Sequence, residues 1–170
     1  MVFVIFGVSG AGKTTVGKLL ADLLGCEFLD ADDYHSAGHI EKMQRGLALD
    51  DADREGWLSA LRARINEVLN EGKTCVLACS ALKAAYRERL AVSGAVKFVY
   101  LRGGFDLIET RLSKRSGHFM PASLLKSQFE ILEEPESEEW TFDAGHSPEK
   151  IIEMLMMKMD GDAGDVEGDK

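Results

Sequence analysis

Residues 7–14 read Gly-Val-Ser-Gly-Ala-Gly-Lys-Thr and lie between an apolar run, residues 2–6, and a helical pattern that begins near Thr15. Glycines in such a loop let backbone N–H groups point inward at a polyphosphate, and the helix that follows adds its positive end. A lysine at this place reaches the β- and γ-phosphates, and the threonine after it can hold Mg²⁺. The sequence therefore predicts a site for a nucleoside triphosphate, with ATP and Mg²⁺ as the expected cofactors.

The expected phosphate contacts run along the whole loop and into the first turn of the helix. They are Gly7, Ser9, Gly10, Ala11, Gly12, Lys13, Thr14 and Thr15. We expect Lys13 to serve the transferring phosphoryl group as a catalytic cation, and Thr14 to be a metal ligand.

Composition narrows the class of protein. A chain of 170 residues can form one domain with a proper core, and a net charge of -9 argues against a surface built for nucleic acids or anionic lipids. Three cysteines, Cys26, Cys75 and Cys79, form a sparse, odd set that fits a reducing compartment, and the last two are expected to be buried strand thiols. With no basic segment ahead of an apolar one at the N-terminus, we expect a cytoplasmic protein without nucleic-acid or membrane partners.

Apolar strands and helical patterns alternate along the chain. Strands are expected at residues 2–6, 26–29, 74–78, 96–101 and 140–142, with helices between them. Such alternation predicts an α/β fold with a parallel sheet covered on both faces. We expect one domain over residues 1–159, followed by a disordered acidic tail over residues 160–170.

Two acidic side chains follow the second expected strand. Asp30 and Asp32 fall on the edge of the sheet where the phosphate loop also lies, because ligands bind at the carboxyl ends of parallel strands. One carboxylate could hold a water of Mg²⁺ while the other accepts a hydroxyl proton. An ordinary acidic turn or helix cap explains the same spacing.

Four basic side chains are candidates for the same edge. Arg54, near the start of a long helix, could be a fork for a substrate carboxylate or a solvated arginine among acidic neighbours. Lys83 follows the third strand and fits a second cation over the crevice as well as a surface lysine. Arg111 and Arg115 could begin a lid over ATP or form a solvated helix face. By position alone, His35 and His118 suit structural or solvated roles better than catalytic ones.

Several motifs together resemble the small, single-domain gluconokinases of the bacterial type, from the first strand to about Ile152. Beyond the phosphate loop, the matching segments are residues 28–32 with His35, residues 40–43, Gly46 with Leu49, residues 51–54, Trp57-Leu58, residues 79–83 with Tyr86-Arg87, residues 98–101, residues 111–112 with Arg115 and residues 117–119, Gln128-Phe129, and residues 132–135. The phosphate loop alone indicates a superfamily, whereas these segments together indicate a substrate.

The resemblance implies ATP-dependent phosphorylation of D-gluconate at its 6-hydroxyl in sugar-acid breakdown. It also implies the P-loop kinase fold, a three-layer sandwich around a five-stranded parallel sheet. A lid at about residues 115–121, and often a homodimer, belong to the same expectation.

Roles for individual residues also follow from the resemblance. Asp32 becomes the catalytic base and Asp30 a ligand on the metal side. Arg54, Lys83, His35 and His118 become the gluconate-binding set, His35 as a partner of a sugar hydroxyl. Arg111 and Arg115 become lid cations on ATP, with Arg115 also catalytic.

Two alternatives stay open at this point. A shikimate kinase shares the two-aspartate segment, but it should carry a glycine triplet where Cys79-Ser80-Ala81 stands. A nucleotide-binding regulatory module without a small-molecule acceptor would leave Asp32, Arg54 and Lys83 without a role. A GTP-binding switch is disfavoured because the chain has no Asn-Lys pair.

Overall fold

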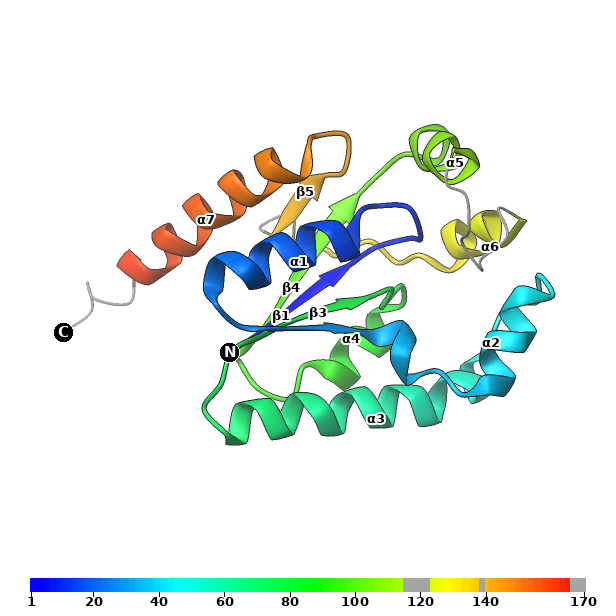
Figure 1. Ribbon diagram of the computed structural model, residues 1–170, viewed down its shortest axis with the longest axis horizontal. Helices are drawn as coiled ribbons and strands as arrows, with labels where there is room; N and C mark the ends of the chain where they lie inside the picture. The colour runs from blue at the N-terminus through cyan, green and yellow to red at the C-terminus, as the bar shows by residue number, and fades with distance from the viewer. Residues whose placement is uncertain (115–122, 138–139, 166–170) are drawn as a thin grey trace.

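The computed structural model describes residues 1–114, 123–137 and 140–165, in which strands and helices alternate (Figure 1). The strands are β1 (Val2–Phe6), β2 (Glu27–Asp30), β3 (Cys75–Cys79), β4 (Val96–Arg102) and β5 (Thr141–Asp143). The helices are α1 (Lys13–Leu24), the short 3₁₀ helix η1 (Ala31–Tyr34), α2 (Ala37–Gln44), α3 (Asp51–Asn70), α4 (Ala84–Leu90), α5 (Phe105–Ser113), α6 (Ser123–Ile131) and α7 (Pro148–Asp165).

The five strands form one parallel sheet in the order β2-β3-β1-β4-β5. Strand β1 lies in the middle, where Val4 pairs with Leu77 of β3 and with Phe98 of β4. All residues of β1 are buried, as expected for a central parallel strand with helices on both faces. The predicted α/β fold with a five-stranded parallel sheet is therefore confirmed.

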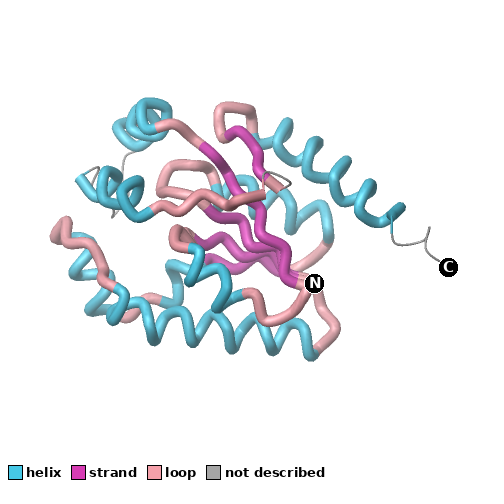
Figure 2. The backbone as a smooth tube through the Cα atoms, turned by 180° about the vertical axis from the view of Figure 1, so that it is seen from behind, coloured by secondary structure: helices cyan, strands magenta, loops and turns pink. Residues whose placement is uncertain are grey.

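Helices cover both faces of the sheet (Figure 2). Alternate β1 residues face opposite sides: Val4 packs into a core with Trp57 and Leu61 of α3, while Ile5 packs into a core with Leu20 of α1. Helix α7 lies beside α1 on that second face (Figure 1). Each loop at the carboxyl end of a strand is thus held from both sides.

The caps of two helices fix segments of the site. Helix α1 begins directly after Gly12, whose φ of 100° is left-handed, and ends at Gly25, whose N–H donates to carbonyls of the last turn. At the start of α3, Asp50 and Asp53 form a reciprocal capping box. This box fixes the first turn of α3, which carries Arg54.

The three cysteines are free, and Cys75 and Cys79 are buried in β3, as predicted. Burial raises the pKa of the Cys79 thiol to about 12, so this side chain packs as an uncharged group. Every helix in residues 1–114, 123–137 and 140–165 is too short or too polar to cross a membrane.

Helix α7 continues to Asp165, so the described backbone is helical within a segment for which composition predicts a disordered tail. The remainder of that segment, residues 166–170, lies outside the described residues, as does the expected lid at about residues 115–121. Arg115 and His118 are therefore not placed.

Candidate active site

The phosphate loop connects β1 to α1 in a conformation that needs glycine. Gly7 has a φ of 142°, and a Cβ there would lie 2.8 Å from the carbonyl oxygen of Leu101. Gly10 has a φ of 85°, and a Cβ there would lie 3.0 Å from the Leu112 side chain. Since only glycine adopts these angles without strain, the loop can curl tightly ahead of the positive end of α1.

Two side chains at the start of α1 take up positions that suit a polyphosphate. The Lys13 ammonium donates to the carbonyl oxygen of Val8, 3.0 Å away, so it lies against the loop. The Thr14 hydroxyl donates to a carboxylate oxygen of Asp30 over 3.2 Å. A hydroxyl and a carboxylate thus meet beside the loop, as the predicted metal-side pair requires.

Asp30 and Asp32 point to different neighbours although one residue separates them. Asp30 ends β2, and its other carboxylate oxygen accepts from the Asp32 N–H at 3.1 Å, which caps η1. The Asp32 side chain is 51% exposed and lines the cavity. Loss of water around the Asp32 carboxyl raises its pKa, against the opposing charge of Lys13. The two carboxylates therefore have distinct environments: Asp30 is engaged by Thr14 and by the backbone of η1, and Asp32 lines the cavity.

His35 is held flat against Trp57, with ring centroids 4.8 Å apart and planes 8° apart. The Trp57 indole donates to the carbonyl oxygen of Ala31 at 2.7 Å, which fixes this stack to η1. Burial, and then the charges of His39 and Arg54, lower the pKa of His35 to about 4. At neutral pH His35 is an uncharged imidazole, 4.0 Å from Asp32, and its Nδ1 has no hydrogen-bond partner within the described residues.

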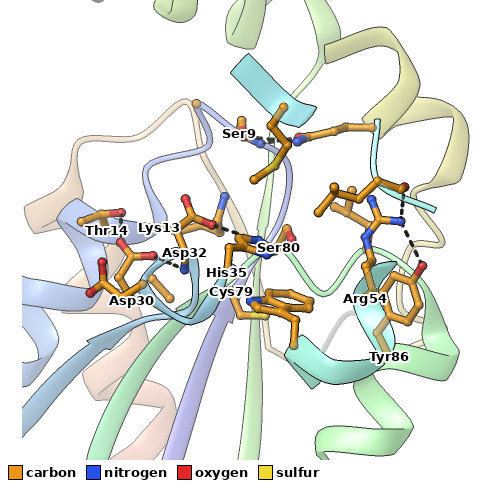
Figure 3. Close-up of a pocket in the computed structure, with 18 of the residues that line it drawn as sticks. Ser9, Lys13, Thr14, Asp30, Asp32, His35, Arg54, Cys79, Ser80 and Tyr86 are labelled. Atoms are coloured by element: carbon orange, nitrogen blue, oxygen red, sulfur yellow. Dashed lines mark hydrogen bonds and ion pairs between the residues drawn. The ribbon is translucent and has the colours of Figure 1, made fainter. Parts of the chain in front are cut away.

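Arg54 extends from the first turn of α3 into the cavity. Its guanidinium donates to the carbonyl oxygen of Leu49 at 2.6 Å and to the Tyr86 hydroxyl at 3.4 Å. The same group lies 5.6 Å from the centre of the Tyr86 ring. The arginine is thus held in place while one side of its planar fork faces the cavity (Figure 3).

Lys83 is placed differently from the prediction. Its ammonium lies 2.8 Å from both carboxylate oxygens of Asp51, which also accepts from the Tyr86 hydroxyl. Lys83 lines a neighbouring hollow of about 260 Å³ rather than the main cavity, although Arg54 borders both. In this structure an ion pair with α3 therefore holds Lys83 at the edge of the site.

One cavity of about 310 Å³ brings together most of the predicted site residues. Those that line it are Ser9, Gly10, Gly12, Lys13, Thr14, Thr15, Asp30, Asp32, His35 and Arg54. Figure 3 shows Thr14 and Asp30 on one side, Lys13 and Asp32 between, and Arg54 on the other side. The phosphate loop and Arg54 thus face the same cavity.

The sequence analysis did not single out the other residues that line this cavity, among them Trp57, Ser80, Tyr86 and Gln128. Trp57 and Tyr86 fit the apolar periodicity of their helices, so the sequence indicates core residues and gives no sign that they also line a cavity. Ser80 and Gln128 occur only within segments of the family resemblance. Next to Ser80, Ala81 has a φ of 40° and is the one non-glycine residue with positive φ in the described part of the chain.

A further hollow of about 250 Å³ lies on the other side of the phosphate loop. Ala11, Thr15 and Arg111 border it, together with His146 and Pro148 from the segment between β5 and α7. Arg111 therefore lies beside the phosphate loop, and its contact with ATP stays a prediction. The sequence analysis did not single out His146 or Pro148.

A phosphate loop that shares a cavity with an aspartate and an arginine is typical of one class of protein. Phosphoryl transfer needs positioning, cations on the transferring oxygens and a group that accepts the acceptor's proton. Lys13, Asp32 and Arg54 carry side chains of the types that these needs require, and all three line one cavity. The fold and the site are those of a P-loop kinase that acts on a small molecule.

Comparison with known proteins narrows this class. The family model for shikimate kinase matches residues 9–152. The gluconokinase of Arabidopsis thaliana is 43% identical, with 91% of this chain and 90% of that protein covered. The thermosensitive gluconokinase of Escherichia coli K12 is 44% identical, over 81% of this chain and 74% of that protein.

Solved structures agree. A gluconokinase from Sinorhizobium meliloti 1021 superposes with a TM-score of 0.84 at 36% identity, covering 97% of this chain and 94% of that one. Shikimate kinase from Aquifex aeolicus reaches a TM-score of 0.60 at 17% identity, covering 96% of this chain and 98% of that one, and so shares the fold. The chain belongs to the gluconokinase family, within the wider group that the shikimate kinase model describes.

Proposed function

We propose that this protein transfers the γ-phosphoryl group of ATP to the 6-hydroxyl of D-gluconate, giving ADP and 6-phospho-D-gluconate. The observation that carries the proposal is the shared cavity, in which the phosphate loop faces Asp32 and Arg54. Relatives that are more than 40% identical and carry the name gluconokinase support the choice of acceptor.

On the donor side, the triphosphate would lie in the phosphate loop with its nucleoside toward the hollow bordered by Arg111 and His146. Thr14 and Asp30 would hold Mg²⁺, the Thr14 hydroxyl directly and Asp30 through a water. A hydroxyl and a carboxylate 3.2 Å apart fit this ion, which prefers oxygen ligands and keeps several waters. When bound, Mg²⁺ neutralises charge on the β- and γ-phosphate oxygens.

On the acceptor side, Asp32 would accept the proton of the 6-hydroxyl as the new O–P bond forms and the bond from the γ-phosphorus to ADP breaks. Its raised pKa suits a base, and its position beside the Lys13 loop suits in-line attack. Lys13 would stay on the transferring oxygens. Arg115 in the lid stays a prediction, since it lies outside the described residues.

The rest of gluconate would lie between η1 and α3. Arg54 would bind the carboxylate through its fork, and neutral His35, which lines the cavity, would hydrogen-bond a sugar hydroxyl. Lys83 would have to exchange Asp51 for the substrate carboxylate in order to take part. His118 stays a predicted contact outside the described residues.

We also propose that the protein works in the cytoplasm as a homodimer. Free thiols at Cys26, Cys75 and Cys79 support a reducing compartment. The family resemblance supports the dimer, and light scattering after size-exclusion chromatography tests it.

A coupled ADP-release assay tests the proposed activity with D-gluconate, its C5 epimer, shikimate and nucleoside monophosphates as acceptors. We expect turnover with gluconate well above that with every other acceptor. Turnover with shikimate alone would assign the site to the related class of kinases, and ADP binding without any transfer would favour a nucleotide-binding regulatory module.

A further inference from the structure

Helix α6 is the element that contacts both halves of the active site. Leu125 on one side is 1% exposed and packs in the core beneath α1 and α7. Leu124 packs with Met43 and Leu49, which line the acceptor side. Gln128, one turn further along, borders the main cavity and reaches the phosphate loop.

Gln128 holds Ser9 through two hydrogen bonds. The Ser9 backbone N–H donates to the Gln128 Oε1 at 2.7 Å, and the Gln128 amide nitrogen donates to the Ser9 hydroxyl at 3.3 Å. Because the backbone N–H can only donate, it fixes which end of the amide faces the loop. The contact joins residues that are 119 positions apart in the chain.

Ser9 provides a point at which the phosphate loop can be fixed by a hydrogen bond. It lies between Gly7 and Gly10, which have left-handed φ angles and no side chains that could anchor the backbone. The Ser9 N–H, predicted to contact phosphate, is instead given to Gln128 in this structure. Two other N–H groups of the loop donate to backbone carbonyls, that of Gly7 to Ser80 at 3.3 Å and that of Ala11 to Val8 at 3.2 Å.

We propose that Gln128 is a positioning residue for phosphoryl transfer, which acts through Ser9 to fix the phosphate loop relative to the acceptor. The proposal rests on the proposed kinase activity for its kinetic consequence. Its cause is geometric: a displacement of about 1 Å between the γ-phosphorus and the acceptor oxygen can lower the rate about 10²-fold. Since α6 also packs against the acceptor side, Gln128 sets that distance between two walls of one cavity.

The main variant is Gln128→Met, which keeps the length of the side chain and removes both hydrogen bonds. Lys126→Ala is the matched control, because Lys126 lies on the exposed side of the same helix and pairs only at 3.9 Å with Glu130. We expect Gln128→Met to lower kcat about 10- to 100-fold. KM for ATP and for gluconate should change less than about threefold, since substrate binding groups are kept. Lys126→Ala should match the wild type.

A kcat for Gln128→Met within twofold of the wild type would overturn the proposal. So would a loss expressed mainly in the KM for gluconate, which would make Gln128 an acceptor ligand. Ser9→Ala provides a second test, since the effects of Ser9→Ala and Gln128→Met on kcat must be less than additive if one acts through the other. Additive effects would contradict the proposal.

Hydrogen exchange at the Ser9 amide separates this inference from the proposed function. Measured without substrates, exchange should be at least about 10-fold faster in Gln128→Met than in the wild type and unchanged in Lys126→Ala. If a well-folded Gln128→Met protein kept wild-type exchange, the contact would not hold the loop. Failure of the wild type to phosphorylate gluconate would instead refute the proposed function and leave the exchange result intact.

Discussion

Asp32 is the residue on which the transfer step depends in the proposed mechanism. It lies in the cavity near the phosphate loop, whereas Asp30 is engaged by the Thr14 hydroxyl. We expect Asp32→Asn to lower kcat by about 10²-fold or more with little change in nucleotide affinity, because an amide cannot accept the proton. Steady-state kinetics and nucleotide titration measure both quantities. Asp33→Asn is the neighbouring control, and an Asp32→Asn enzyme with unchanged kcat would remove Asp32 from the role of base.

His35 makes a prediction about stability and pH. Its pKa is about 4 in the folded protein, below the ordinary value, so the unfolded chain binds a proton first as the pH falls. The free energy of unfolding should therefore decrease between about pH 6.5 and pH 4, by up to about 3 kcal/mol from this residue. Urea unfolding across this range, compared between wild type and His35→Gln, isolates the effect. Equal pH slopes in the two proteins would show that His35 is not buried as a neutral imidazole.

The sequence predicted some of the residues that line the candidate site, whereas contacts between distant segments became visible only in the structure. Asp32 follows β2, so the topology alone brings it to the edge of the sheet where the phosphate loop lies. Arg54 was assigned to the site only through the family resemblance, because its position near the start of a helix also suits a solvated arginine. Lys83 likewise follows a strand, yet Asp51 in the first turn of α3 holds it. Gln128 contacts a loop 119 positions away, and no local pattern in the sequence encodes such a contact.

At the scale of elements, the start of α3 combines a helix cap with Arg54, the proposed ligand of the gluconate carboxylate. Asp50 caps the helix by accepting from the Asp53 N–H at 2.8 Å, and Arg54 follows immediately. We expect Asp50→Ala to cost about 1 kcal/mol of stability. The same change should raise KM for gluconate less than Arg54→Ala does, with KM for ATP unchanged. Asp50→Ser keeps a capping oxygen, so it should restore most of the stability and most of the affinity for gluconate. If Asp50→Ala raised only the KM for ATP, the start of α3 would serve ATP binding rather than gluconate binding.

The sequence predicted the strands and helices wherever apolar periodicity or a terminal glycine was clear. Alternating apolar strands and amphipathic helices predicted the parallel sheet, and glycines marked both ends of α1. The end of α7 was not predictable, because an Asp- and Gly-rich composition disfavours helix while the backbone of the structure continues as helix to Asp165. Composition indicates only the average helix propensity of a segment. Packing of Ile151 and Leu155 in the core anchors α7, and because a helix extends more easily than it starts, α7 continues beyond its packed part.

At the scale of the whole molecule, the two cores share a single sheet and should unfold together. Trp57 reports on the core beneath α3, and Trp140 packs at the core on the other face. We expect single-tryptophan variants, Trp57→Phe and Trp140→Phe, each to show fluorescence and circular dichroism transitions with the same urea midpoint. If the two probes differed in midpoint within one variant, the faces of the sheet would be separate folding units.

Kinases with different acceptors share this fold. Shikimate kinase from Aquifex aeolicus shares the fold at 17% identity, so the fold alone does not identify the acceptor. In the proposed function, the acceptor is distinguished by local features, among them Arg54 on α3 and the Cys79-Ser80-Ala81 turn, in which Ala81 has a positive φ.

Identification of the product tests the central claim most directly. Incubated with ATP, Mg²⁺ and D-gluconate, the enzyme should form ADP and a gluconate phosphate in equal amounts, and phosphorus NMR should show that phosphate coupled to the two protons on C6. Phosphate on another hydroxyl, or ADP formed together with inorganic phosphate alone, would contradict the account.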